Sequence, residues 1–247
     1  MKGKQRRTLL RHIRAFHPDL DDPIGAIAER RVRVAGRIVV NPAALVERDA
    51  PIVVTAPREL RGSAKLRAAI SAFDITVAGC VALDLGAAAG GFTTVLIESA
   101  ARCVYAVDVG HGQLLGSLRQ DARVVNLERT NLARLDRRLI PDDVDVVTMD
   151  LSYLSVARAL GQLQGVVFAG GADLVALVKP MFELGLATAP EDDDLVDEAG
   201  RRAWEGASAA GWQPVQLIRS PVEGAKGARE LFLHAIRATS TPSTPPS

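Results

Sequence analysis

The sequence predicts an α/β protein: a mostly parallel sheet with helices on both faces, preceded by a small separate module. From residue 79 onward, apolar strand-like runs alternate with helical patterns, which is typical of parallel strands joined by crossover helices. The strand-like runs lie near 81–84, 103–108, 123–127, 144–150 and 173–179. Two further runs, 215–219 and 230–236, flank a Gly/Lys loop and predict an antiparallel hairpin at the sheet edge.

The first 57 residues read as the small module. Apolar residues at helical spacing predict a helix over 9–16, and a second short helix is expected over 24–30, after Pro23. Alternating residues around a glycine turn predict strands within 32–40, and another strand is expected at 52–54. The predicted organisation is therefore a module over 1–57, a linker and basic helix over 58–78, an α/β domain over 79–238 and a disordered Ser/Thr/Pro tail over 239–247.

Charge is distributed unevenly along the chain. Residues 1–70 hold 15 Lys/Arg and 7 Asp/Glu, a net charge of +8, whereas residues 71–247 hold 15 and 22, a net charge of −7. A basic module in front of an acidic body suggests that the module holds a polyanion. A basic face that is merely solvated is the alternative interpretation.

Several partner classes are not favoured. The longest uncharged stretch, Ala159–Ala172, is 14 residues long and contains glutamines and glycines, so it is too short and too polar to span a bilayer. The four histidines and two cysteines have no metal-ligand spacing, and no signal peptide is recognisable. We expect a cytoplasmic protein that contacts no membrane and uses no metal.

Residues 81–93, Val-Ala-Leu-Asp-Leu-Gly-Ala-Ala-Ala-Gly-Gly-Phe-Thr, read as a strand that enters a helix through a loop closely approached by a ligand. Asp84 ends the strand and Gly86 makes the turn. The next strand ends in Asp108, where a carboxylate can bind both hydroxyls of a cofactor ribose. A dinucleotide site would favour glycine in place of Ala88, and no basic residue follows to meet phosphate. The pattern therefore predicts S-adenosylmethionine (SAM).

Three further strand ends carry charge. Asp150 ends the run 144–150, Lys179 ends the run 173–179, and Glu230 begins the last strand. Because that strand is expected to run antiparallel, it starts at the edge where the parallel strands finish. Charges at the ends of apolar runs are costly unless they are paired. They indicate a functional edge, with a purely structural lysine–carboxylate pair as the alternative.

These residues resemble the hemolysin-A-like TlyA family, rRNA 2′-O-methyltransferases of the broader FtsJ type. The resemblance covers most of the chain, and its most distinctive part is Tyr105–Leu114. The matching motifs are Arg61-Gly62-x-x-Lys65-Leu66, Leu83-Asp84-Leu85-Gly86-Ala87-x-x-Gly90-Gly91-Phe92-Thr93, Tyr105-Ala106-Val107-Asp108-Val109-Gly110-x-Gly112-Gln113-Leu114, Glu128-Arg129-Thr130-Asn131, Asp150-x-Ser152 and Val178-Lys179-Pro180-x-Phe182-Glu183.

The resemblance implies a Rossmann-like class I SAM-dependent methyltransferase with a seven-stranded sheet, and an α-L-type RNA-binding domain over 1–57. It implies a catalytic set made of Lys65, Asp150, Lys179 and Glu230. The expected cofactor-binding residues are Asp84, Gly86, Gly90, Gly91, Phe92, Thr93, Asp108, Val109, Asn131 and Asp150. The expected RNA-binding residues are Arg30, Arg31, Arg33, Arg37, Arg61 and Arg67.

Two lysines suit methyl transfer to a ribose hydroxyl. That hydroxyl is a weak nucleophile and must lose its proton as it attacks in line. An unperturbed lysine is almost entirely protonated at neutral pH. A second ammonium group and burial both favour the neutral amine, whereas Asp150 and Glu230 would oppose that shift while fixing the position of the amine. Either Lys179 is the base, or it stabilises a developing alkoxide while a carboxylate takes the proton.

The leading hypothesis is a SAM-dependent methyltransferase that modifies a ribose 2′-hydroxyl of ribosomal RNA, as free rRNA or in ribosomal subunits, and in this family on a cytidine. One alternative is a methyltransferase of the same fold that acts on another RNA or on a small acceptor. Another is a non-catalytic RNA-binding or ribosome-assembly factor, which the four charged residues of the catalytic set disfavour. A membrane-lytic protein is the least favoured, because no spanning segment is present.

Overall fold

The computed structural model describes residues 5–20, 22–55 and 60–238. The described residues form two compact units, one within 1–59 together with 115–121, the other within 60–114 and 122–247. The tail expected over 239–247 lies outside the described residues, so its disorder stays a prediction. Each unit has its own apolar core and is described by itself.

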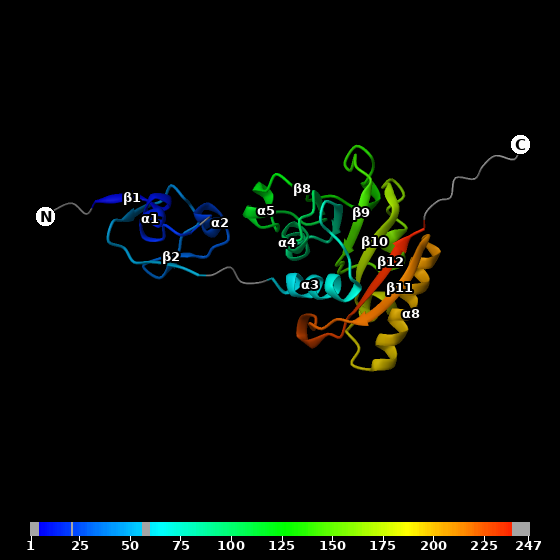
Figure 1. Cartoon of the computed structure of the whole chain (residues 1–247). Helices are drawn as coiled ribbons and strands as arrows, with labels where there is room; N and C mark the ends of the chain where they lie inside the picture. The colour runs from blue at the N-terminus through cyan, green and yellow to red at the C-terminus, as the bar shows by residue number, and fades with distance from the viewer. Residues whose placement is uncertain (1–4, 21, 56–59, 239–247) are drawn as a thin grey trace, which may run out of the picture. The chain divides into compact units, whose positions relative to one another are not determined.

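The first unit combines three short helices, one of them α5 (Gly116–Gln120), with two small antiparallel sheets (Figure 1). Helix α1 (Leu9–Phe16) has the predicted bounds, and α2 (Pro23–Ala28) ends before the predicted residue 30. The side chain of Thr8 caps α1 and that of Asp22 caps α2. The sheets are β1 (Arg6–Thr8) with β4 (Leu45–Glu47), and β3 (Arg37–Ile38), β2 (Val32–Val34) and β5 (Ile52–Val54) in that order. The core is Leu9, Ile13, Ala26, Ile27, Val32, Val34 and Val46.

The second unit is built on a seven-stranded sheet with the order β11-β12-β10-β9-β6-β7-β8. Strands β6 to β10 are parallel, and β12 is antiparallel to both of its neighbours, so the predicted sheet with its antiparallel hairpin is confirmed (Figure 1). The strands are β6 (Val81–Leu85), β7 (Cys103–Val107), β8 (Val124–Leu127), β9 (Val144–Met149), β10 (Phe168–Val178), β11 (Trp212–Arg219) and β12 (Leu231–Arg237). β10 begins earlier than the predicted residue 173, with an irregular register between Phe168 and Asp173.

Side chains that alternate along the strands form two cores, one on each face of this sheet. Helices α3 (Arg61–Phe73) and α4 (Gly91–Glu98) cover one face, while α6 (Val156–Leu160) and α8 (Asp193–Ala209) cover the other. In β10, for example, Val175 faces the α3/α4 side and Leu174 faces the α6/α8 side. The short elements of this unit are α7 (Pro180–Leu184) and the 3-10 helices η1 (Leu132–Arg134) and η2 (Ala225–Gly227).

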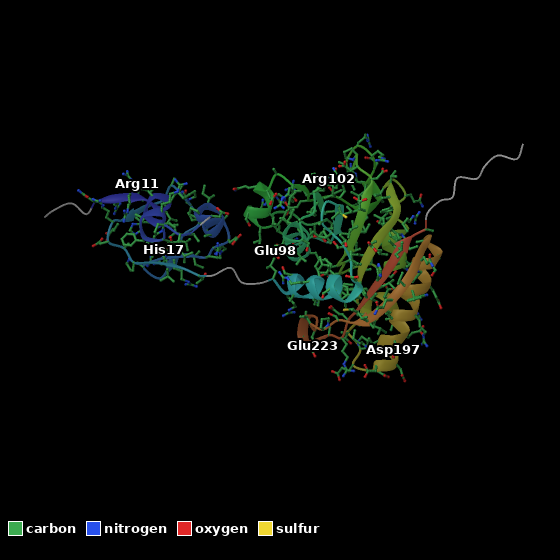
Figure 2. The ribbon with its side chains drawn as sticks, viewed as in Figure 1. Arg11, His17, Glu98, Arg102, Asp197 and Glu223 are labelled. Carbon is green, nitrogen blue, oxygen red and sulfur yellow. The ribbon has the colours of Figure 1, made fainter. Side chains whose placement is uncertain are left out.

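Charged side chains lie mainly on the outside of this unit. Figure 2 shows Glu98, Asp197 and Glu223 at its surface, and all three are exposed. In the described residues, no helix has both the length and the apolar character needed to cross a membrane. The buried charged groups are few, and most lie at the carboxyl edge of the parallel strands, where the candidate site is found.

Candidate active site

The loop between β6 and α4 requires glycine at two points. Gly86 has φ +86°, and a Cβ there would collide with the carbonyl oxygen of Asp150 at the end of the neighbouring β9. Gly90, with φ +98°, caps α4 in the left-handed region. The loop therefore lies flat against the strand ends. A pocket above it is lined by Leu60, Arg61, Gly62, Gly86, Ala87, Ala88, Ala89, Gly91, Phe92 and Asp150.

Asp84 lies beneath this loop with no exposed surface. Thr93 Oγ1 donates to Asp84 Oδ2 at 2.6 Å, and Thr148 Oγ1 donates to Oδ1 at 3.0 Å. Burial raises the pKa of Asp84 to about 6, although both hydroxyl hydrogen bonds act to lower it. The carboxylate therefore ties the first turn of α4 to β9, and it holds the glycine loop from below rather than lining the pocket above it.

Asp108 follows β7 and has both carboxylate oxygens fixed by the backbone. The Ala88 amide donates to Oδ2 at 2.9 Å, and the Gly110 amide donates to Oδ1 at 2.6 Å. A second pocket in front of it is lined by Gly86, Val107, Asp108, Val109, Thr130, Leu132, Leu151 and Tyr153. The apolar walls and one oriented carboxylate suit a nucleoside: the ribose hydroxyls would bind Asp108 and the base would lie among the aliphatic side chains.

Two lysine–carboxylate pairs lie at the same edge. Lys65 Nζ on α3 pairs with Glu230 Oε2 at the start of β12, and the two side chains are only 5% and 6% exposed. Gly224 makes this possible, because a Cβ there would collide with the Glu230 carboxylate. The pair joins residues 165 positions apart, and it is sealed from solvent.

Lys179 forms the second pair, which is more open. Its Nζ pairs with Asp150 Oδ1 and donates to Ser152 Oγ at 3.0 Å, and its side chain is 16% exposed. Lys179 directly follows β10 and Asp150 directly follows the adjacent β9, so the parallel strands bring them together. Two oxygen partners fix one ammonium group at the mouth of a pocket, where a substrate can reach it.

That pocket is lined by five basic side chains, those of Arg61, Lys65, Lys179, Lys226 and Arg229. Lys65 and Lys179 are paired with Glu230 and Asp150, and Arg229 pairs with Asp193 at 3.0 Å, so among the described residues Arg61 and Lys226 supply the uncompensated positive charge. Lys226 adopts φ +58°, which places a non-glycine residue in the left-handed region on the rim. An acceptor that enters here meets excess cationic charge, which favours a phosphate-bearing molecule.

Not every residue predicted for the cofactor turns its side chain toward a pocket. Thr93 is fully buried and donates to Asp84, so it positions the loop from below. Phe92 has only 3% exposure and packs against Phe232, although it forms part of the pocket wall. The side chain of Asn131 caps η1 by accepting the Ala133 amide at 3.0 Å. Sequence reasoning missed its neighbours Thr130 and Leu132, which line the nucleoside pocket, because neither has a distinctive residue type.

The predicted RNA-binding arginines are in different situations. Arg61 begins α3 and lines both the cofactor pocket and the basic pocket. Arg67 lies on the exposed side of α3 and pairs with Glu98 of α4 at 2.8 Å, which turns it away from both pockets. In the first unit, Arg31 pairs with Glu29 at 2.8 Å and is only 13% exposed, whereas Arg30, Arg33 and Arg37 are exposed.

Residues 59–237 match the FtsJ-like methyltransferase family. The chain belongs to the FtsJ-like methyltransferase family. It is 41% identical to the 16S/23S rRNA (cytidine-2'-O)-methyltransferase TlyA of Mycobacterium tuberculosis, over 84% of this chain and 80% of that protein. It is 34% identical to Hemolysin A of Brachyspira hyodysenteriae, over 71% and 75% of the two chains. A solved structure titled "The crystal structure of a putative hemolysin from Lactococcus lactis" superposes with a TM-score of 0.68 at 29% identity, over 72% and 88%.

SAM is the cofactor of this methyltransferase. The residues present fit it: the glycine loop leaves room beside Asp150, Asp108 offers an oriented carboxylate, and the neighbouring pocket is mostly apolar. The loop carries no basic side chain between Gly86 and Gly91, as expected for a cofactor without phosphates. SAM, the cofactor predicted from the sequence, is thus confirmed.

Proposed function

We propose that this methyltransferase transfers a methyl group to the 2′-hydroxyl of a cytidine ribose in ribosomal RNA. The observation that carries the proposal is the pair of lysine–carboxylate bridges in a pocket beside the cofactor loop, with Arg61 and Lys226 as further cations. The relative from M. tuberculosis, whose name states this reaction, is aligned over most of both chains.

Lys179 is the residue proposed to act on the hydroxyl. It is the more exposed of the two lysines, and Asp150 and Ser152 hold its Nζ in one position. Bound SAM supplies an electrophilic methyl group. Lys179 Nζ, after releasing its own proton, takes the hydroxyl proton as the new O–C bond forms and the C–S bond breaks, so the products are a methylated ribose, S-adenosylhomocysteine and a protonated lysine.

Lys65 and Glu230 are proposed to shape the pocket and not to exchange protons with substrate. Both are almost fully buried, and each neutralises the other. Their bridge fixes α3 against the start of β12 and so holds part of the wall of the pocket that Lys179 also lines. Removing either partner leaves a buried charge without compensation, which costs about 3–5 kcal/mol in comparable bridges.

The first unit is proposed to hold RNA through residues 1–57, with Arg33 and Arg37 on its exposed β2–β3 turn. Its composition and the basic charge of residues 1–70 support this division. The cytoplasmic location follows from a ribosomal substrate and stays a prediction.

The test is to incubate the protein with tritiated SAM and, in separate reactions, ribosomal subunits, protein-free rRNA and tRNA. The proposal predicts that label enters rRNA and is recovered as 2′-O-methylcytidine after digestion to nucleosides. Label in tRNA alone, or on a base instead of the ribose, would contradict it.

A further inference from the structure

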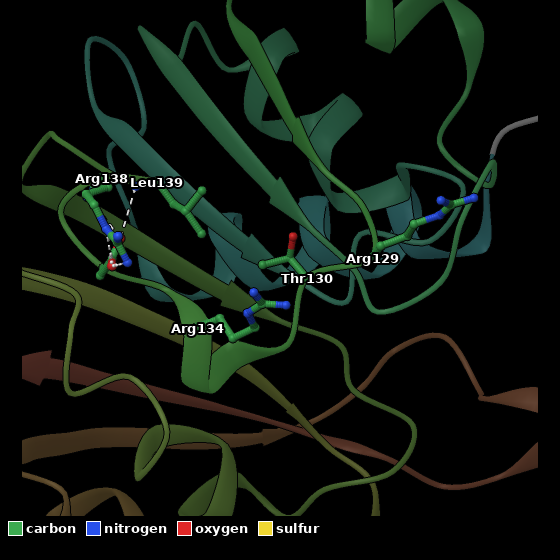
Figure 3. Close-up of a pocket in the computed structure, with 6 residues that line it drawn as sticks. Arg129, Thr130, Arg134, Arg138 and Leu139 are labelled. Atoms are coloured by element: carbon green, nitrogen blue, oxygen red, sulfur yellow. Dashed lines mark hydrogen bonds and ion pairs between the residues drawn. The ribbon is translucent and has the colours of Figure 1, made fainter.

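A second basic pocket is formed by the segment that follows strand β8, and its arginines are not assigned to cofactor or acceptor. It is lined by Arg129, Thr130, Arg134, Asp136, Arg138 and Leu139 (Figure 3). An adjoining hollow shares Arg134, Asp136 and Arg138 and continues to the polar side chains of Gln162 and Gln164. We call this continuous surface the arginine groove. It stands out because residues 71–247 carry a net charge of −7.

The positive charge of the groove is largely uncompensated. In the described part of the chain, the side chains of Arg129 and Arg134 have no hydrogen-bond or ion-pair partner, and Figure 3 shows both without a dashed contact. Arg138 pairs with Asp136 at 2.7 Å, and that hydrogen-bonded pair lowers the pKa of Asp136. Three guanidinium groups against one carboxylate leave a local charge of about +2.

Glu128, the acidic residue next to Arg129 in the sequence, makes its contacts elsewhere. Glu128 is only 9% exposed, and its Oε1 accepts the backbone amides of Gln113 at 2.8 Å and Leu114 at 3.2 Å. Although burial acts to raise it, these backbone hydrogen bonds lower the pKa of Glu128 to about 2. The charge of Glu128 is therefore bound by the backbone amides of Gln113 and Leu114.

The backbone beneath the groove is fixed. Arg129 adopts φ +56°, with its amide donating to Gly110 O at 2.9 Å, while the Thr130 amide donates to Asp108 O at 3.0 Å. Leu132 and Leu135 anchor the following segment in the core with 1% and 2% exposure. The arginines therefore project from a rigid support that is attached to the same segment as Asp108, and Thr130 lines both the groove and the nucleoside pocket.

We propose that the arginine groove binds backbone phosphates of the substrate RNA at nucleotides that flank the methylated one. The proposal rests on the proposed function. Guanidinium groups bind phosphate through two parallel hydrogen bonds, which suits arginine better than lysine. Neither hollow of the groove shares a lining residue with the pocket that contains Lys179, so we expect the groove to bind nucleotides other than the target nucleotide.

The test compares Arg129→Ala/Arg134→Ala with Arg102→Ala/Arg201→Ala, which removes two exposed arginines of the same unit elsewhere. Arg102 directly precedes β7, at the amino ends of the parallel strands, and Arg201 lies on α8. Affinity is measured by fluorescence anisotropy with a labelled single-stranded rRNA fragment and with a short oligonucleotide that spans only the acceptor pocket. Thermal unfolding verifies that each variant is folded.

The groove variant should lose about tenfold or more in affinity for the long RNA, and the slope of log affinity against log salt should fall by about 1–1.5, at about 0.7 per phosphate contact. The short oligonucleotide should bind it almost as tightly as it binds the wild type. Asp136→Asn, which retains the oxygen that caps the following turn, should raise affinity for the long RNA because it removes the only acid that lines the pocket of Figure 3.

Equal losses in the groove variant and the Arg102/Arg201 variant, or equal losses for long and short RNA, would overturn the proposal. Competition by inorganic phosphate at millimolar concentration with no effect of RNA length would show a free-anion site instead. Failure of the proposed function is recognised separately: the wild-type protein would then methylate no ribosomal RNA, whereas the groove is judged by RNA binding alone.

Discussion

Glu183 connects α7, which follows the reactive lysine, to the start of α6, and its replacement by glutamine gives a prediction with a definite sign. Glu183 lies on α7, which begins directly after Lys179, and its Oε1 accepts the backbone amide of Val156 at the start of α6. Burial raises the pKa of Glu183 from 4.5 to about 7, with the Val156 hydrogen bond and the charge of Arg202 on α8 acting to lower it. The folded protein therefore favours the protonated carboxyl.

The sign follows from linkage. A carboxyl with a folded pKa above its unfolded pKa stabilises the fold at low pH, and that stability is lost as pH rises from about 4.5 to about 7. Between pH 5 and pH 8, ionisation of Glu183 lowers the free energy of unfolding of the wild type by about 2–3 kcal/mol. Glutamine keeps an oxygen for the Val156 amide and does not ionise. Glu183→Gln should therefore gain about 2 kcal/mol over wild type at pH 8 relative to their difference at pH 5.

The assay is urea unfolding of both proteins at a series of pH values. Glu198→Gln is the control, because two arginine hydrogen bonds lower the pKa of Glu198. Its stability difference from wild type should then be flat between pH 5 and pH 8. A Glu183→Gln difference that is flat over the same range, or that falls with rising pH, would refute the reasoning.

The remaining predictions concern the cofactor and the RNA. Asp108→Ala should weaken SAM binding by about 1.5–3 kcal/mol, the scale of hydrogen bonds to a charged group, and calorimetry with unchanged affinity would count against the ribose contact. Arg33→Glu/Arg37→Glu should lower rRNA affinity and its salt dependence while leaving SAM affinity intact, because both side chains are exposed on the first unit. Unaltered rRNA binding across a salt series would argue that this unit has another role.

Much of the second unit could be predicted because its signals are local. Each parallel strand is a short apolar run, and the ends of β6 and β7 carry the acids that mark the cofactor site. The first unit was harder. The pairing of β1 with β4 involves strands of three residues, too short for alternation to be recognised.

Side-chain direction could not be predicted from motifs. Thr93 and Asn131 belong to the matching motifs, yet the first supports Asp84 from within the core and the second caps η1. The particular pairing of Lys65 with Glu230, and of Lys179 with Asp150, depends on the order of strands in the sheet, which sequence spacing does not define. The arginine groove could not be predicted from the sequence either, because the sequence does not show which arginines lack an ion-pair partner.

The most direct test of the central claim is the rate of methyl transfer to rRNA by variants of Lys179 under single-turnover conditions. Lys179→Ala and Lys179→Met should lower the rate by at least about 10²-fold, the low end for loss of a general base, with SAM affinity nearly unchanged. Lys226→Ala, which removes a cation from the same pocket, should act mainly through RNA affinity. Lys179→Arg should be as inactive as alanine, because a guanidinium group does not give up its proton. An active Lys179→Arg variant would contradict the base role and support an electrostatic one, and an active Lys179→Ala variant would contradict the assignment of this edge as the active site.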